Sequence, residues 1–246
     1  MNNQPYHAAV FGATSAIAFE TLRAIASERP AFFLLIGRNQ QRLESIATDL
    51  RQRGAECRIA MEDLLNPDRD WSELLSGRTW NLLYIAHGSL PDQDMTLSDS
   101  HATGREIDVN FISPVRIANA CVRKLEEQKR GSLAIIGSVA GDRGRQSNYF
   151  YGATKAGLNT FTEGLAHRFA DSPEIHITLL KPGMTDTPMT ADIPKGPLFS
   201  SAQKVGSLAW KAISKHKTVA YLPGWWWAVM NIIRHLPRPV FHRTKL

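Results

Sequence analysis

A tyrosine and a lysine four residues apart carry the most distinctive chemistry in this sequence. Tyr151 and Lys155 open residues 151–170, whose pattern predicts a helix, so the two side chains lie on one face, one turn apart. A phenol with a pKa of about 10 is a poor acid or base at neutral pH, but a nearby ammonium favours the phenolate and lowers that pKa. The pair could therefore give a proton to a carbonyl oxygen or take one from an alcohol. An ordinary pair on a helix surface has the same spacing, so other residues must decide.

Two polar residues upstream could complete such a site. Ser138 follows residues 132–136, an apolar run that predicts a strand, and its hydroxyl could hydrogen-bond the same substrate oxygen. Asn110 lies within residues 106–129, which predict one long helix. The alternative for Asn110 is an amide on the surface of that helix.

The start of the chain suggests where a dinucleotide would bind. Residues 8–11 predict a strand that runs into Gly12-Ala13-Thr14-Ser15-Ala16-Ile17-Ala18. A tight turn followed by a helix N-terminus would direct backbone N–H groups at a pyrophosphate. Alanines stand where such turns usually have a second and a third glycine, so an ordinary strand-to-helix turn remains an alternative.

The end of the second predicted strand, residues 32–36, indicates which dinucleotide this is. NAD-binding enzymes tend to place Asp or Glu there to bind the ribose 2′-hydroxyl. This chain has Gly37-Arg38-Asn39 and no acid. A guanidinium at that point can pair with a 2′-phosphate, which predicts NADP(H) rather than NAD(H). The alternative is that Arg38 is a solvated surface charge.

The elements that must position these residues alternate along the chain. Further apolar runs at residues 57–61, 82–86 and 175–180 predict strands, and residues 19–27 and 40–53 predict helices. Strands that are apolar on both faces and are each followed by a helix predict the α/β class, a single Rossmann-fold, doubly wound parallel sheet with helices on both faces. Ligands bind beyond the carboxyl ends of such strands, which is where the chain places Gly12, Gly37, Asp63, Gly88, Ser138 and Pro182.

As a set, these residues resemble the short-chain dehydrogenase/reductase family over about residues 7–190. The resemblance rests on Gly12-Ala13-Thr14-Ser15, Asp63, Ala86-His87-Gly88, Asn110, Ile136-Gly137-Ser138, Tyr151-x-x-x-Lys155 and Pro182-Gly183-Met184-Thr185-Asp186-Thr187. It implies that Ser138 orients a carbonyl, that Tyr151 is the general acid/base, and that Lys155 lowers the tyrosine pKa and binds the nicotinamide ribose. It also implies that Asn110 holds a water in the proton relay.

The resemblance further implies a set of cofactor contacts and no metal site. Asp63 would contact the adenine, and residues 182–187 would lie along the nicotinamide and pyrophosphate. The expected cofactor-binding residues are Gly12, Thr14, Ser15, Ala16, Ile17, Arg38, Asn39, Asp63, Leu64, Ala86, His87, Gly88, Tyr151, Lys155, Pro182, Gly183, Thr185 and Thr187.

The chain departs from the family pattern in two places. The usual Asn-Asn-Ala-Gly after the fourth strand is Ile85-Ala86-His87-Gly88, and the glycine-rich turn is reduced to one glycine. Neither change touches the proton-transfer residues. His87 could be a second acid/base or a substrate contact, or a packed or solvated loop side chain.

Basic charge is concentrated at the C-terminus. The net charge is +6, yet the first 192 residues carry −3, and no Asp or Glu follows Asp192. We therefore divide the chain into residues 1–192, a Rossmann-type NADP(H)-binding catalytic domain, and residues 193–246, a substrate lid and basic segment of the same domain. The basic residues of that segment are Lys195, Lys204, Lys211, Lys215, Lys217, Arg234, Arg238, Arg243 and Lys245.

The end of this segment, YLPGWWWAVMNIIRHLPRPVFHRTKL at residues 221–246, is apolar as well as basic. The run is too short to span a bilayer but suits an anchor on an anionic membrane surface. Alternatively it packs on the domain or on a second subunit and closes the substrate pocket. Nucleic acid is not an expected partner, because no known motif supports it.

The substrate is expected to be a ketone, reduced reversibly to a secondary alcohol. Ala86-x-Gly88-x-Leu90-x-Asp92 and the tryptophan-rich basic end loosely resemble the branch of polyprenylphosphoryl keto-sugar reductases. This implies an amphiphilic or lipid-linked substrate; the alternatives are a 3-keto lipid, a small soluble ketone, or a non-catalytic NADPH-binding module. The family usually pairs through its long helices, which implies a homodimer or homotetramer.

The expected location is the cytoplasm, on the inner face of the membrane if the C-terminal segment binds lipid. Met1 to His7 lack the features of a secretory leader. Cys57 and Cys121 are expected to be reduced thiols.

Overall fold

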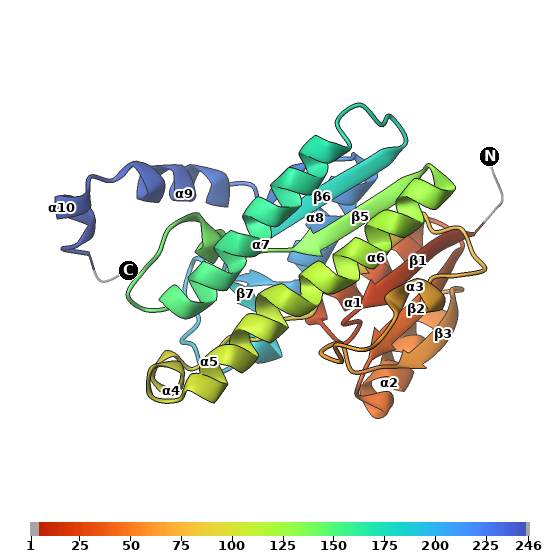
Figure 1. Cartoon of the computed structure of the whole chain (residues 1–246), viewed down its shortest axis with the longest axis horizontal. Helices are drawn as coiled ribbons and strands as arrows, with labels where there is room; N and C mark the ends of the chain where they lie inside the picture. Colours follow the sequence, from red (N-terminus) through yellow and green to blue (C-terminus); the bar gives the residue numbers. More distant parts are fainter. Residues whose placement is uncertain (1–4, 245–246) are drawn as a thin grey trace.

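Seven parallel strands form the central sheet of the computed structural model, which describes residues 5–244 (Figure 1). The strands are β1 (Tyr6–Phe11), β2 (Ala31–Gly37), β3 (Glu56–Met61), β4 (Leu82–Ile85), β5 (Gly131–Ile136), β6 (Ile175–Pro182) and β9 (Val219–Leu222). Their order across the sheet is β3-β2-β1-β4-β5-β6-β9. The predicted α/β fold with a doubly wound parallel sheet is therefore confirmed.

Helices cover both faces of this sheet. The longer helices are α1 (Ala16–Glu28), α2 (Gln40–Gln52), α5 (Ser100–Ile107), α6 (Ser113–Gln128), α7 (Tyr149–Arg168), α8 (Ala202–Ser214) and α9 (Trp226–His235). The shorter elements are α3 (Trp71–Leu74), α4 (Gln93–Ser98), α10 (Arg238–Phe241), the 3-10 turns η2 (Val139–Asp142) and η3 (Pro188–Thr190), and a small sheet of β7 (Thr185–Asp186) and β8 (Ser200–Ser201).

Alternate residues of each strand point to opposite cores. Ala8 and Val10 of β1 pack with α1, α2 and α8, whereas Ala9 and Phe11 pack with α3, α6 and α7. Figure 1 shows α6 and α7 running diagonally across the front of the sheet. Because both faces are buried, the strand pattern is apolar throughout, which made these strands predictable.

The long helix expected at residues 106–129 is broken, so that expectation was wrong. The structure has α5, then a π-helical turn η1 (Asp108–Ile112), then α6, which begins at Ser113 and has Pro114 in its first turn. A proline has no N–H to give to the carbonyl four residues earlier, which here is that of Asn110. The break thus falls on a residue expected in the site.

The C-terminal segment is built into the sheet. The strand β9 pairs with β6, and α8 packs on α1. Neither element was predicted, because β9 has only four residues and buries only every second one. The boundary drawn after residue 192 therefore marks a change in charge, whereas the sheet continues across it.

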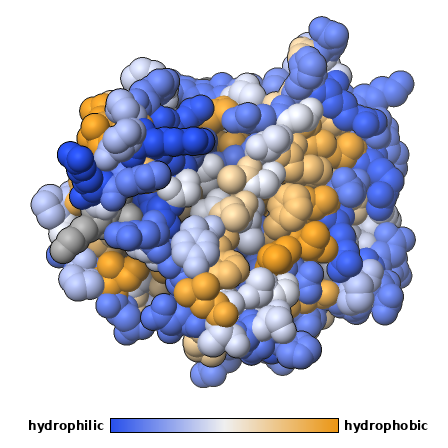
Figure 2. Space-filling view, turned by 60° about the vertical axis from the view of Figure 1, so that its left-hand side comes forward, coloured by the Kyte–Doolittle hydropathy of each residue, from blue (hydrophilic) through white to orange (hydrophobic). Residues whose placement is uncertain are grey.

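Apolar side chains also reach the surface. Figure 2 shows an apolar band that crosses the face turned forward, with hydrophilic residues on both sides of it. The exposed large apolar side chains include those of Met95, Leu97, Ile107, Trp225, Trp227, Ile232 and Val240.

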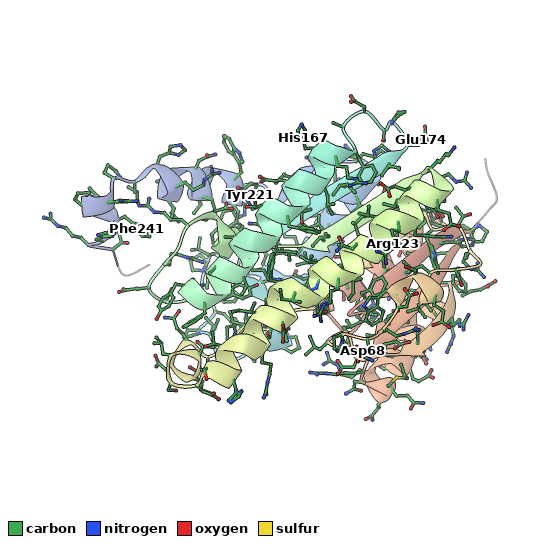
Figure 3. All side chains as sticks on the ribbon, viewed as in Figure 1. Asp68, Arg123, His167, Glu174, Tyr221 and Phe241 are labelled. Carbon is green, nitrogen blue, oxygen red and sulfur yellow. The ribbon has the colours of Figure 1, made fainter. Side chains whose placement is uncertain are left out.

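The last helices form an arm, residues 226–244, that extends beyond the sheet edge. Tyr221 lies at its base and Phe241 near its outer end (Figure 3). Trp226, Met230 and Ile233 of α9 are buried against Val139, while Trp227 and Ile232 are 60% and 66% exposed. Lys245 and residues 1–4 lie outside the described residues.

Arg143 fastens this arm to the domain. Its guanidinium donates hydrogen bonds to the carbonyls of Ile233, Arg234 and Leu236, and it lies 3.8 Å from the ring centroid of Phe241. These contacts satisfy carbonyls that the end of α9 leaves free. Among the helices of residues 5–244, none has the length and apolar character needed to cross a membrane.

Candidate active site

A cavity of about 940 Å³ opens at the carboxyl ends of the central strands. All of the expected cofactor-binding residues line it, and so do Ser138, Tyr151 and Lys155. Asn110 is the one expected site residue outside the lining. The volume lies near the upper end of the range for ligand sites, so it suits a large cofactor together with a substrate.

The first turn at the cavity requires glycine. Gly12 has φ +83°, and a Cβ there would lie 2.6 Å from the backbone nitrogen of His87. After this turn, the Ser15 side chain caps α1 by accepting from the N–H of Ala18. The first turn of α1, with Ala16, lines the cavity. The backbone N–H groups and helix dipole there favour an anionic ligand.

Two arginines, rather than one, lie at the end of β2. The expected Arg38 is exposed at the cavity. The Asn39 side chain accepts from the N–H of Arg42 at 2.9 Å and so caps α2. Arg42 lines the cavity as well, and its guanidinium donates to the carbonyl of Thr14 at 3.1 Å. One feature of the sequence could have indicated Arg42: it is a cation in the first turn of a helix, where the helix dipole disfavours positive charge.

His87 is packed against the Gly12 turn. Its Nε2 lies 2.9 Å from the Ser113 Oγ, and that hydroxyl donates to the carbonyl of Leu64 at 2.5 Å. Burial, followed by the charge of Lys155, lowers the pKa of His87 to about 3. The imidazole is therefore neutral at physiological pH. This environment supports the packed alternative for His87 over a second acid/base.

Ser138, Tyr151 and Lys155 meet at the centre of the cavity. Ser138 ends the β5 segment, and its Oγ accepts from the N–H of Ala140 at 3.0 Å. Lys155, one turn after Tyr151 on α7, donates from Nζ to the carbonyl of Ile136 at 3.3 Å and lies 5.7 Å from the tyrosine ring centroid. Lys155 is only 2% exposed. One helix and one strand end thus bring the three side chains together.

The sequence analysis expected Lys155 to lower the pKa of Tyr151, but in the structure this pKa is raised. Burial raises the pKa of Tyr151 to about 12, against a smaller opposing effect of a hydrogen bond from Ser138. Burial also lowers the pKa of Lys155 to about 8. Burial disfavours the charged form of each group, so the tyrosine keeps its proton and the lysine binds its proton less firmly.

Asn110 lies behind the cavity wall. Its Nδ2 donates to the Ser89 Oγ and to a carboxylate oxygen of Glu106, both at 3.1 Å, and its Oδ1 accepts from the Ser89 N–H. A Cβ on Gly88 would lie 3.0 Å from this Oδ1 and 3.3 Å from the Lys155 Nζ. Gly88 therefore allows the amide and the ammonium to approach each other. No motif in the sequence predicted the contribution of Glu106.

Two other positioning contacts have no motif in the sequence. Asn159 donates from Nδ2 to the carbonyl of Ser138 at 3.3 Å, which holds the loop carrying that serine. The indole of Trp226 lies so close over Gly183 that a Cβ there would overlap the ring. Trp226 thereby brings the C-terminal arm into the cavity wall.

Comparisons with known proteins identify relatives of this chain. The family model described as short chain dehydrogenase matches residues 6–197. An uncharacterized oxidoreductase of Streptomyces coelicolor is 29% identical over 239 residues, which cover 95% of this chain and 94% of the relative. One of Mycobacterium tuberculosis is 28% identical over 242 residues and 95% of each chain.

Solved structures show the same fold. A short-chain dehydrogenase from Sphingobium yanoikuyae in complex with NADPH matches with a TM-score of 0.81 and 21% identity, over 97% of this chain and 96% of that one. The bulky-bulky ketone specific alcohol dehydrogenase from Comamonas testosteroni matches with a TM-score of 0.80 and 20% identity, over 99% and 96%.

Proposed function

The chain belongs to the short-chain dehydrogenase family of oxidoreductases, and from this premise we propose that it reduces a ketone to a secondary alcohol with NADPH, reversibly. The observation that carries the proposal is the convergence of Ser138, Tyr151 and Lys155 in one cavity with a glycine turn and two arginines. When bound, the nicotinamide supplies the hydride.

The chain's own residues supply and position the proton. Tyr151 is protonated at physiological pH, so it has the proton that the carbonyl oxygen receives, and a cationic Lys155 nearby favours release of that proton. Ser138 hydrogen-bonds the same oxygen and orients it. Asn110 would hold a water of the proton relay beside Lys155, since its Oδ1 and the Lys155 Nζ lie 3.0 and 3.3 Å from the same Cβ position at Gly88.

The cofactor end fits NADPH. The Gly12 turn and the N-terminus of α1 receive the pyrophosphate. Arg38 and Arg42 line the cavity after β2, which supports a ribose 2′-phosphate there, and residues 37–39, which end β2 and follow it, include no Asp or Glu that could bind a 2′-hydroxyl. Asp63 contacts the adenine, and residues 182–187 follow the nicotinamide and pyrophosphate.

The C-terminal arm gives the substrate its direction of approach. Trp226 closes the cavity over Gly183, while Trp227 and Ile232 face outward on the same helix, near Arg234 and Arg238. Exposed indoles with nearby cations favour an anionic membrane surface. The substrate is therefore an amphiphilic or lipid-linked ketone, such as a polyprenyl-phosphate keto-sugar, taken at the inner face of the membrane. Cys57 and Cys121 are free thiols, in keeping with the cytoplasm.

A second copy of the chain is the proposed partner for α6 and α7. Phe111 of η1 and Phe161 of α7 are partly exposed, Phe111 lies against Gly157, and Gly164 is exposed, so a second pair of helices could approach α7 closely. Apolar and small residues of this kind are typical of buried helix interfaces. A homodimer or homotetramer follows.

The test is NADPH oxidation with a panel of ketones. We expect Tyr151→Phe to lower kcat at least about hundredfold, because proton transfer contributes at least that factor. Tyr149→Phe is the matched control, since it makes the same change at an exposed tyrosine on the same helix. Equal turnover by Tyr151→Phe and wild type would contradict the mechanism. Cofactor binding without turnover of any ketone would indicate a non-catalytic NADPH-binding module.

A further inference from the structure

Four of the residues that line the cavity have a buried polar side-chain atom without a hydrogen-bond partner. One is the Nδ1 of His87, which is packed at the Gly12 turn. The other three are the Nε of Arg145, the Oδ1 of Asn148 and the Nε1 of Trp226. Buried polar atoms are almost always paired, because leaving one unpaired costs about 1–3 kcal/mol. Three such atoms on one cavity indicate a ligand that pairs with them.

Arg145 has a charge that the protein does not neutralise. It forms no ion pair and donates no side-chain hydrogen bond to any residue of the described chain, 5–244. The nearest carboxylate, Asp142, is already occupied: its Oδ1 pairs with Lys181 and its Oδ2 accepts from Tyr221 at 2.7 Å. Burial lowers the pKa of Arg145 despite the presence of Asp142, which marks a cation held partly out of water.

A neighbouring arginine, Arg143, is fully engaged by the protein, so the unpaired guanidinium is specific to Arg145. Arg143 lies two residues earlier on the same loop and donates to three backbone carbonyls of the C-terminal arm. Arg143 therefore already anchors the arm to the domain. Arg145 is not needed for that contact and lines the cavity.

Arg145 and Asn148 lie on the loop that leads into α7, apart from the segments expected to hold the cofactor phosphates, whereas Trp226 lies over Gly183. Asn148 directly precedes α7, one turn before Tyr151, and its side chain makes no capping bond to that helix. The expected phosphate contacts of the cofactor come instead from the Gly12 turn and from Arg42, on segments that follow β1 and β2. A group that reaches Arg145 and Asn148 is thus attached to the molecule whose carbonyl meets Tyr151.

We propose that the substrate ketone carries an anionic group, a phosphate or a carboxylate, which the guanidinium of Arg145 binds. Between that group and the carbonyl, the Asn148 Oδ1 accepts from a substrate hydroxyl, and the indole N–H of Trp226 donates to a substrate oxygen. A guanidinium presents a fork of donors that matches both anions. This assignment rests on the proposed ketone reduction and specifies its substrate class.

Binding to the protein saturated with NADP⁺ tests the assignment without turnover, because the oxidised cofactor cannot reduce a ketone. It also fills the 2′-phosphate position at Arg42. Calorimetry compares ribulose 5-phosphate with ribulose, and 5-ketogluconate with fructose, so that each anion type is judged against a neutral ketone. The variants are Arg145→Gln and Arg145→Lys; Arg58→Gln, at an exposed arginine on β3, is the control.

We expect at least one anionic probe to bind about tenfold or more tightly than its neutral partner, as for a charge-assisted pair. Arg145→Gln should abolish the preference, Arg145→Lys should keep part of it, and Arg58→Gln should keep all of it. The assignment is overturned if neither pair shows a preference in the wild type, or if the preference persists in Arg145→Gln. Failure of the reductase proposal would appear separately, as unchanged turnover in Tyr151→Phe.

Discussion

Lys155 and Tyr151 respond in opposite directions to the same burial. The lysine is charged when protonated, so burial lowers its pKa to about 8; the tyrosine is charged when deprotonated, so burial raises its pKa to about 12. At neutral pH the tyrosine is therefore fully protonated, and the lysine is mostly so. A reductase needs this pair of states, an acid that has its proton beside a cation.

This pair predicts how reduction depends on pH. The charge on Lys155 is present below about pH 8 and is lost as pH rises through that value, while Tyr151 stays protonated. We expect kcat/KM for ketone reduction to be flat near pH 6.5 and to fall about tenfold per unit well above pH 8. Lys155→Arg should remove this fall, since a guanidinium stays charged. A wild-type profile that is flat from pH 6.5 to 9.5 would contradict the role of the lysine.

Replacing Arg42 should reduce the preference for NADPH over NADH. A charge-assisted contact to a 2′-phosphate is worth about 1.5–3 kcal/mol, so Arg42→Ala should raise the KM for NADPH about ten- to hundredfold. The KM for NADH should change little, because NADH lacks that phosphate. Steady-state kinetics with both cofactors measure the two values, with Arg58→Ala as the control. Equal effects on NADPH and NADH would place Arg42 outside the phosphate site.

The proton-transfer residues were predictable because their spacing follows helical periodicity and the ends of strands. Arg38 was found in the same way, by its place after β2. Arg42 was missed although its place in the first turn of a helix was a signal. Arg145 was missed because its role depends on which hydrogen bonds other residues leave unmade. No local sequence pattern records that Asp142 is already taken by Lys181 and Tyr221.

Among the elements, the turn between β1 and α1 has the least freedom. Gly12→Ala would place a Cβ 2.6 Å from the His87 nitrogen and also strain a backbone with φ +83°. Gly54→Ala is a matched control, because Gly54 has φ +86° but nothing within 4 Å of its Cβ position. We expect Gly54→Ala to cost about 1–2 kcal/mol of unfolding free energy, and Gly12→Ala to cost more and also to weaken NADPH binding. Thermal melting with and without NADPH distinguishes them; equal losses would show that the close approach to His87 is unimportant.

At the scale of elements, the sequence predicted the six strands from β1 to β6 and the helices α1, α2 and α7. Their apolar faces repeat over enough residues to be seen. The break at η1 was not predicted. Pro114 is acceptable in the first turn of a helix, but the sequence pattern did not show that a new helix begins there. The strand β9 escaped because its pairing with β6 brings together residues about forty apart in the chain.

At the scale of the whole molecule, the C-terminal arm both packs on the domain and faces outward. The packing alternative drawn from its sequence describes the inner side of α9, and binding of the outer side to a membrane stays a prediction. Trp226, Met230 and Ile233 explain the packing, and Trp227 and Ile232 remain exposed. Periodicity alone did not separate the two sides, since apolar residues lie on both.

From the exposed side of α9 we predict that the protein binds anionic vesicles. The full-length protein should float with vesicles that contain phosphatidylglycerol and not with neutral phosphatidylcholine vesicles, and added salt should reduce binding. Trp227→Ala with Ile232→Ser should lower the bound fraction several-fold. Leu97→Ser, at an exposed leucine on α4, serves as the control. If the wild type stays wholly in the soluble fraction at low salt, the arm does not bind membrane.

The central claim is that Tyr151 gives a proton to a carbonyl while NADPH gives a hydride to the same group. Incubation of the protein with NADPH deuterated at both hydrogens of nicotinamide C4 and with a reducible ketone tests this by mass spectrometry of the product. We predict an alcohol with one deuterium on the former carbonyl carbon for wild type and for Tyr149→Phe, at a rate lowered at least about hundredfold in Tyr151→Phe. No deuterium in the wild-type product, or the same rate of transfer in Tyr151→Phe, would contradict the account.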